Sequence, residues 1–171
     1  MDISVNTMEL KLKLEELSSL WRYFCEKHTD LYEATCDEYM HLLSSDIEKL
    51  DLSLALKQEI ITEISTLELS RQGVITQLSS LLNIEKPLKL EALLSVLKDN
   101  NEVSMASEIE KYNLVLLDII DKIQEQNKKN QVFLNKAILS LQTLRESFSG
   151  KKTYKTYSSL GKTSSNNISP N

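Results

Sequence analysis

The 171-residue chain contains three glycines and two prolines, whereas average usage would give roughly 12 and 9, so turns are rare and elements are long. Its residues are 41% apolar and 26% charged, and only 6% are aromatic, a composition that can form a core and favours helices over sheets. Residues 1–148 carry 16 basic and 25 acidic groups, whereas residues 149–171 carry four lysines and no acid. The acidic body argues against nucleic acid as the main partner.

The sequence also predicts a cytoplasmic protein without membrane insertion. The first residues, MDISVNTMELKLKLEEL, lack the basic start and apolar core of a secretory signal. The longest apolar runs are about four residues, far below the roughly 18 that a membrane span needs. Cys25 and Cys36 fall on one predicted helix, about 16 Å apart along its axis, which is too far for a disulfide.

A heptad row of apolar residues predicts a first helix over about residues 7–48, with Asn6 or Thr7 as its cap. The spacing alternates between four and three residues along Leu10, Leu14, Leu17, Trp21, Phe24, His28 and Leu31. The row then shifts to Tyr32, Cys36, Tyr39, Leu43 and Leu50. Such a stutter changes the supercoil locally without ending the helix.

Two further helices are expected before residue 100. The second begins at Asp51 or Ser53 and ends near Asn83 and Pro87. Its row consists of Ile60, Ile64, Leu67, Arg71, Val74, Leu78 and Leu81. A shorter, leucine-rich helix follows over about residues 88–98, and the polar sequence at 99–101 indicates a turn.

The last helix has the longest apolar row. It covers 44 residues, or about 66 Å at 1.5 Å per residue. The row comprises Met105, Ile109, Tyr112, Leu116, Ile119, Ile123, Gln126, Asn130, Phe133, Ala137, Leu141, Leu144 and Phe148. Gln126 and Asn130 interrupt it, and polar residues at such positions fix register or mark loose packing.

Gly150 ends this helix, and residues 149–171 are rich in Ser, Thr, Asn and Lys without periodicity. They cannot bury enough apolar surface to fold, so we predict a disordered basic tail at 149–171 after a helical bundle at 1–148. The tail contains Gly161-Lys162-Thr163, which resembles the end of a phosphate-binding loop. However, Thr156 stands where that loop needs glycine, and no strand is expected before it, so nucleotide binding is not predicted.

The fold class that follows is all-α. Long helices in one short chain must fold back on each other, which predicts an elongated antiparallel helical bundle or coiled coil of two to four helices.

The sequence predicts neither a metal site, nor a cofactor, nor an enzyme. Glu38 and His41 have the Glu-x-x-His spacing of di-iron bundles, but the required second pair is missing. Cys25, His28 and the other candidates lie on one helix, without the chain reversal that surrounds a zinc ion. The abundant carboxylates fall on outward faces, and no pocket-forming loop accompanies them.

What remains is binding through a helical surface. The last helix has an apolar row longer than its neighbours can cover, so it can hold an amphipathic helix of a partner. A homodimer through the same row stays open as an alternative.

The order of short motifs resembles the FlgN-like family of flagellar secretion chaperones. The motifs are Leu-Tyr-Glu-Ala at 31–34, Lys57-Gln58-Glu59, the leucine–arginine segment 67–71, Asn127, Asn130 and Asn135, and Tyr157 to Gly161. The resemblance covers nearly the whole chain.

This resemblance implies a cytoplasmic chaperone of flagellar type III export that is not an enzyme. It would bind the C-terminal amphipathic helices of hook–filament junction proteins and present them to the export gate. The client is expected along the last helix, at Leu116, Ile119, Ile123, Phe133 and Leu141. The resemblance assigns docking at the export gate to Tyr157, with Tyr154 as the near alternative. A self-associating coiled-coil scaffold or adaptor without a secretion client is the other function that the pattern allows.

Overall fold

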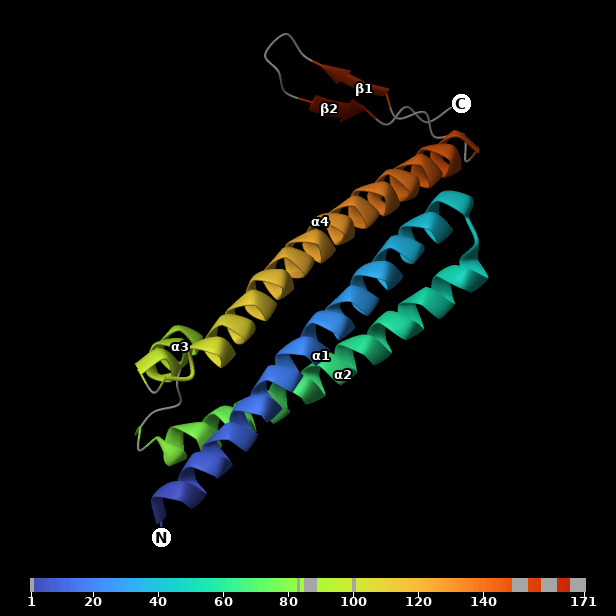
Figure 1. Ribbon diagram of the computed structural model, residues 1–171. Coiled ribbons are helices and arrows are strands. Elements are labelled where there is room, and N and C mark those ends of the chain that lie inside the picture. Colours follow the sequence, from blue (N-terminus) through green and yellow to red (C-terminus); the bar gives the residue numbers. More distant parts are fainter. Residues whose placement is uncertain are drawn as a thin grey trace, which may run out of the picture. The chain divides into compact units, whose positions relative to one another are not determined.

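The computed structural model describes residues 2–82, 84, 89–99, 101–148, 154–157 and 163–166. Its helices are α1 (Asp2–Ser44), α2 (Ile47–Leu81), α3 (Leu90–Asp99) and α4 (Val103–Phe148), and two short strands follow, β1 (Tyr154–Tyr157) and β2 (Thr163–Asn166) (Figure 1). The prediction of an all-α helical bundle is therefore confirmed. The chain divides into two compact units, Met1–Lys128 and Lys129–Asn171, and α4 passes from the first into the second.

The reversal between α1 and α2 lies earlier than the sequence suggested. The backbone of Ser45 is in the left-handed region with a φ of 56°, and the Asp46 backbone N–H donates to the His41 carbonyl over 3.1 Å. The Asp46 carboxylate then accepts a hydrogen bond from the Lys49 backbone N–H and caps α2. This bond holds the pKa of Asp46 below its usual value. Because a carboxylate cap of this kind starts a helix, α2 begins at Ile47 and the predicted starts at Asp51 or Ser53 were wrong.

Helices α1 and α2 then run antiparallel, side by side, for most of their length (Figure 1).

At the other end of the first unit, α3 begins at Leu90, close to the predicted start. The predicted turn before α4 is also present. Asn101 has a φ of 63°, and the Glu102 backbone N–H donates to the Leu97 carbonyl over 2.9 Å. Left-handed residues of this type commonly end helices, which is why α3 stops at Asp99.

The apolar core of the first unit combines side chains from all four helices. Its most buried members are Leu14, Leu17, Leu78, Leu93, Leu97 and Ile109. Trp21 and Phe24 of α1 extend this core, with ring centroids 6.2 Å apart. Burying a side chain of this size stabilises a fold by about 1.5–3 kcal/mol. The heptad rows expected from the sequence therefore supply the core, with α3 contributing three buried leucines.

The second unit contains the end of α4 and the β1–β2 pair. The strands are antiparallel, with Tyr154 opposite Asn166 and Tyr157 opposite Thr163. These eight residues differ from the disordered tail that the sequence predicted, and the other residues of 149–171 lie outside the described residues. Aromatic and β-branched residues in Tyr-Lys-Thr-Tyr favour a strand, although a lone two-stranded pair is only marginally stable.

A strand also precedes Gly161-Lys162-Thr163, contrary to the prediction. Thr163 nevertheless begins a second strand and not a helix. A phosphate-binding loop needs the N-terminus of a following helix and a glycine at the position of Thr156. Both are missing here, so nucleotide binding is still not predicted.

We expect Leu17→Ala to lower the free energy of unfolding by about 2–5 kcal/mol, because it removes a fully buried side chain and leaves a cavity. Leu12→Ala, on the same helix but 55% exposed, serves as the control and should cost about 0.5 kcal/mol or less. Urea unfolding followed by circular dichroism measures both. Equal losses in the two variants would contradict the core described above.

His28 makes the stability of the first unit depend on pH. Its Nδ1 lies 2.7 Å from the Phe24 carbonyl oxygen, and its ring centroid is 6.0 Å from that of Phe24. Burial lowers the pKa of His28 from its ordinary value of 6.5, partly offset by the hydrogen bond to Phe24. The unfolded chain therefore binds the proton more readily, and stability falls as pH drops below about 6.5.

We expect His28→Gln to lose less stability than the wild type between pH 7.5 and pH 5.5, because glutamine cannot take up the proton. Urea midpoints at the two pH values measure this difference. His41→Gln leaves His28 in place and should keep the wild-type loss. If His28→Gln loses as much stability as the wild type between the two pH values, the protonation of His28 does not cause that loss.

Candidate functional site

The five residues predicted to bind a client do not share one environment. Leu116 and Ile123 are buried in the first unit, with exposed fractions of 8% and 7%, and Ile119 is half-buried. Phe133 is also half-buried, whereas Leu141 is 65% exposed. Leu116 packs in the apolar core, so changing it would also destabilise the bundle. The role of all five in binding stays a prediction, and Leu141 is the member most open to a partner.

An exposed apolar row surrounds Leu141 in the second unit. We define the C-terminal stripe as Leu134, Ile138, Leu141, Leu144 and Phe148, whose exposed fractions lie between 44% and 88%. Their spacings of three and four residues place them on one face of α4. A row of large apolar side chains left in solvent usually marks an interaction site.

Sequence reasoning found only part of this stripe. The predicted row included Leu141, Leu144 and Phe148, but Leu134 and Ile138 fell outside it. An α-helix has 3.6 residues per turn, so a strict heptad row drifts around the helix over several turns. Following that drift from Leu141 back to Ile138 and Leu134 is the signal that would have found them.

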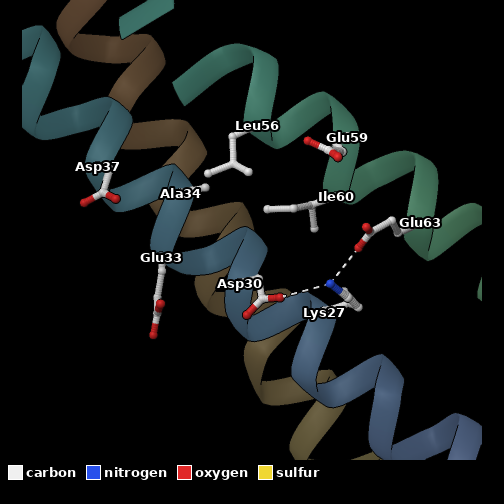
Figure 2. A pocket seen from close by; sticks show the side chains of 9 residues that line it. All are labelled: Lys27, Asp30, Glu33, Ala34, Asp37, Leu56, Glu59, Ile60 and Glu63. Carbon is white, nitrogen blue, oxygen red and sulfur yellow. Dashed lines mark ion pairs between the residues drawn. The ribbon is translucent and has the colours of Figure 1, made fainter. Parts of the chain in front are cut away.

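A second surface feature lies between α1 and α2 in the first unit. It is a cavity of about 360 Å³, which we call the acidic groove (Figure 2). Its lining comprises Lys27, Asp30, Glu33, Ala34, Asp37, Leu56, Glu59, Ile60 and Glu63. Ala34 and Ile60 are buried and give the groove an apolar floor, while five carboxylates and one ammonium group stand around it.

Lys27 joins the two sides of the acidic groove. Its Nζ lies 2.6 Å from Glu63 Oε2 on α2 and 3.4 Å from Asp30 Oδ2 on α1 (Figure 2). The hydrogen bond with Glu63 raises the pKa of Lys27 above its usual value. One lysine thus balances only part of the charge of five carboxylates, and the groove is left strongly acidic.

Three helices of the first unit are also connected through a polar clasp, which we define as Glu38, Lys57 and Asn127. Lys57 Nζ on α2 forms an ion pair with Glu38 on α1 and donates to Asn127 Oδ1 on α4 over 3.1 Å. The side chains of Lys57 and Glu38 are only 13% and 14% exposed. Glu38 was the acid of the Glu-x-x-His pattern, and here it pairs with a lysine. Among the residues that the structure describes, no group of three His, Cys, Asp or Glu side chains could hold a metal ion.

The two cysteines are free, in agreement with the expectation that they cannot pair. Cys25 Sγ donates to the Tyr112 carbonyl oxygen over 3.3 Å, which ties α1 to α4. Burial, with a smaller contribution from Glu26, raises the pKa of the Cys25 thiol. A protonated thiol is a weak nucleophile, so Cys25 is better suited to a structural role than to a catalytic one.

A family model described as FlgN protein matches residues 8–165. The chain belongs to the FlgN family. The match covers nearly the whole chain, including α2, α3 and α4, and it confirms the resemblance drawn from the short motifs. The family implies a role as a flagellar export chaperone. Comparison with curated proteins and with solved structures gives no match.

FlgN family membership makes the exposed helix face more informative than the groove, because a chaperone holds its client through apolar surface. In the part of the chain that the structure describes, no helix is both long and apolar enough to span a membrane.

Tyr154 and Tyr157 form the two ends of β1. Their backbone pairing with β2 is described, but their side chains lie outside the described atoms. Docking at the export gate through Tyr157 or Tyr154 remains a prediction.

We expect Lys57→Met to lower the free energy of unfolding by about 1–3 kcal/mol, because it leaves the carboxylate of Glu38 without its partner in a largely buried place. The double variant Lys57→Met, Glu38→Gln should recover part of this loss, since no charge is then left unpaired. Urea unfolding measures both variants.

Lys122→Met provides a control, because its ion pair with Asp118 is exposed and should matter little. If Lys57→Met is no more damaging than Lys122→Met, the polar clasp does not hold the three helices together.

Proposed function

We propose that this FlgN-family protein is a cytoplasmic chaperone of flagellar type III export. It binds the C-terminal amphipathic helices of hook–filament junction proteins, prevents their premature assembly and delivers them to the export gate. It does this by binding alone, without catalysis. The observation that carries the proposal is the C-terminal stripe of α4, an exposed apolar helix face in a member of a chaperone family.

Binding at this stripe follows from the burial of apolar surface. An amphipathic client helix has an apolar row with the same period, so the two rows can pack as neighbouring helices do. Burying each large side chain contributes about 1.5–3 kcal/mol. Part of this is offset when the client helix loses conformational freedom on binding. The client's own apolar face, once covered, can no longer pair with further copies of the client.

Delivery requires a second contact that is separate from the client. The tail beyond α4 supplies candidates in Tyr157 and Tyr154, because tyrosine combines large buried area with a hydrogen-bonding end. Because the client binds α4 and the docking residues lie in the tail, the protein can bind the client and the export gate at the same time.

We expect Leu141→Asp with Leu144→Asp to abolish binding of the C-terminal region of a hook–filament junction protein, because two charges would be buried against its apolar row. Size exclusion with light scattering measures the complex, which should be 1:1 for the wild type. Leu141 and Leu144 are 65% and 53% exposed, so the variant should stay folded, as circular dichroism can verify. Ile123 is a poorer choice, because at 7% exposure its replacement would also unfold the bundle.

Leu114→Asp with Leu117→Asp is the matched control, since both residues are exposed on the earlier part of the same helix. This control variant should bind the client like the wild type. Undiminished binding by the Leu141 and Leu144 variant would place the client elsewhere.

The apolar row of the stripe also favours a second candidate, a homodimeric scaffold or adaptor in which another copy of the chain covers the row. The same light-scattering measurement without client separates the two. Three results together would favour the scaffold over the chaperone. The wild type would form a dimer that does not dissociate on dilution, the dimer would be lost in the Leu141→Asp, Leu144→Asp variant, and no complex would form with the client region.

A further inference from the structure

The two units of the chain carry opposite charge. Residues 129–171 contain seven basic groups and one acid, a net charge of +6. Residues 1–128 contain 13 basic and 24 acidic groups, a net charge of −11. The unit that contains the C-terminal stripe is therefore the basic one, although the whole chain is acidic.

One basic residue of α4 in the second unit, Arg145, lies on the face of the stripe. Arg145 follows Leu141 by four residues and precedes Phe148 by three, so it shares the face of the stripe. Lys136 is exposed but lies two residues from both Leu134 and Ile138, and a step of two residues turns the helix by about 200°, so Lys136 lies away from the stripe. Neither Lys136 nor Arg145 forms an ion pair with any residue that the structure describes.

The single acid of this segment lies away from the stripe. Glu146 is two residues from both Leu144 and Phe148, and a step of two residues turns an α-helix by about 200°. The face of the stripe therefore carries the positive charge of Arg145, whereas the one acid of α4 in this unit lies off that face.

We infer that the C-terminal stripe selects an amphipathic helix whose apolar row is flanked by acidic side chains. The inference rests on the proposed function and adds the charge of the helix that the stripe accepts. Complementary charge around an apolar contact sets the choice of partner and the rate of association more than the final affinity. In coiled coils the residues beside the apolar seam act in this way.

The first unit strengthens this selection by disfavouring the same helix. Its acidic groove has an apolar floor that could accept a helix, but five carboxylates and one lysine surround it. A helix with acidic flanks would bring like charges together there. An acidic amphipathic helix is thus attracted to the second unit and repelled from the acidic groove.

The test uses the full chain and two synthetic helical peptides with the same row of four leucines. One peptide has glutamates beside the row and the other has lysines. Fluorescence anisotropy measures binding at ~50 mM and ~300 mM salt. We expect the glutamate peptide to bind roughly tenfold more tightly at low salt, with a smaller difference at high salt, because exposed charges are screened.

Charge reversal at the stripe should remove this preference. Arg145→Glu should weaken binding of the glutamate peptide by roughly threefold to tenfold. Lys136→Glu changes the net charge equally on the same helix, away from the stripe, and should leave binding unchanged. Equal binding of the two peptides, tighter binding of the lysine peptide, or an equal effect of Arg145→Glu and Lys136→Glu would each overturn the inference.

The same variants, measured with the C-terminal region of a hook–filament junction protein, separate the inference from the proposed function. If the wild type and the Arg145→Glu variant bind that client equally well, the inference fails and the chaperone function stands. If the wild type binds the glutamate peptide but not the client, the proposed function fails and the charge selectivity of the stripe stands.

Discussion

Burial of the leucine and aromatic rows in the first unit is the interaction on which the rest of the structure depends. It brings together residues of α1, α2, α3 and the beginning of α4. A ten-residue helix such as α3 is not stable alone in water, so Leu93, Leu94 and Leu97 owe their helical form to this packing. The buried apolar residues of α4 end at Ile123, and the apolar row continues to Phe148. A helix whose apolar row extends beyond the core that covers it leaves apolar surface exposed, and such surface usually marks an interaction site.

Outside this core, polar contacts connect the helices of the first unit. The polar clasp fixes α1, α2 and α4 through Lys57, and Lys27 bridges α1 and α2 across the acidic groove. Hydrogen bonds between charged side chains have preferred distances and angles, so the polar clasp constrains how the three helices align. The remaining carboxylates keep the first unit strongly acidic, while the second unit is basic. The two units therefore carry net charges of opposite sign.

The helices of this protein could be predicted well, because each follows from an apolar period that the chain repeats many times. The ends of helices were harder. The start of α2 at Ile47 depends on the left-handed backbone of Ser45 and the carboxylate of Asp46, and neither residue belongs to the apolar row. The strands β1 and β2 were not predicted either, because four-residue segments contain too few alternations to show a period. Of the candidate site, Leu141 was identified in advance, but its neighbours Leu134 and Ile138 were not.

The sequence by itself determined which faces of the helices are apolar, how charge divides between the two parts of the chain, and to which family the chain belongs. Only the tertiary structure decided which members of the apolar row in α4 are covered. Ile123 and Leu141 are both aliphatic and occupy the same row, yet one is 7% exposed and the other 65%. The physical reason is that the period of a row depends on the helix alone, whereas burial depends on whether other helices lie against it.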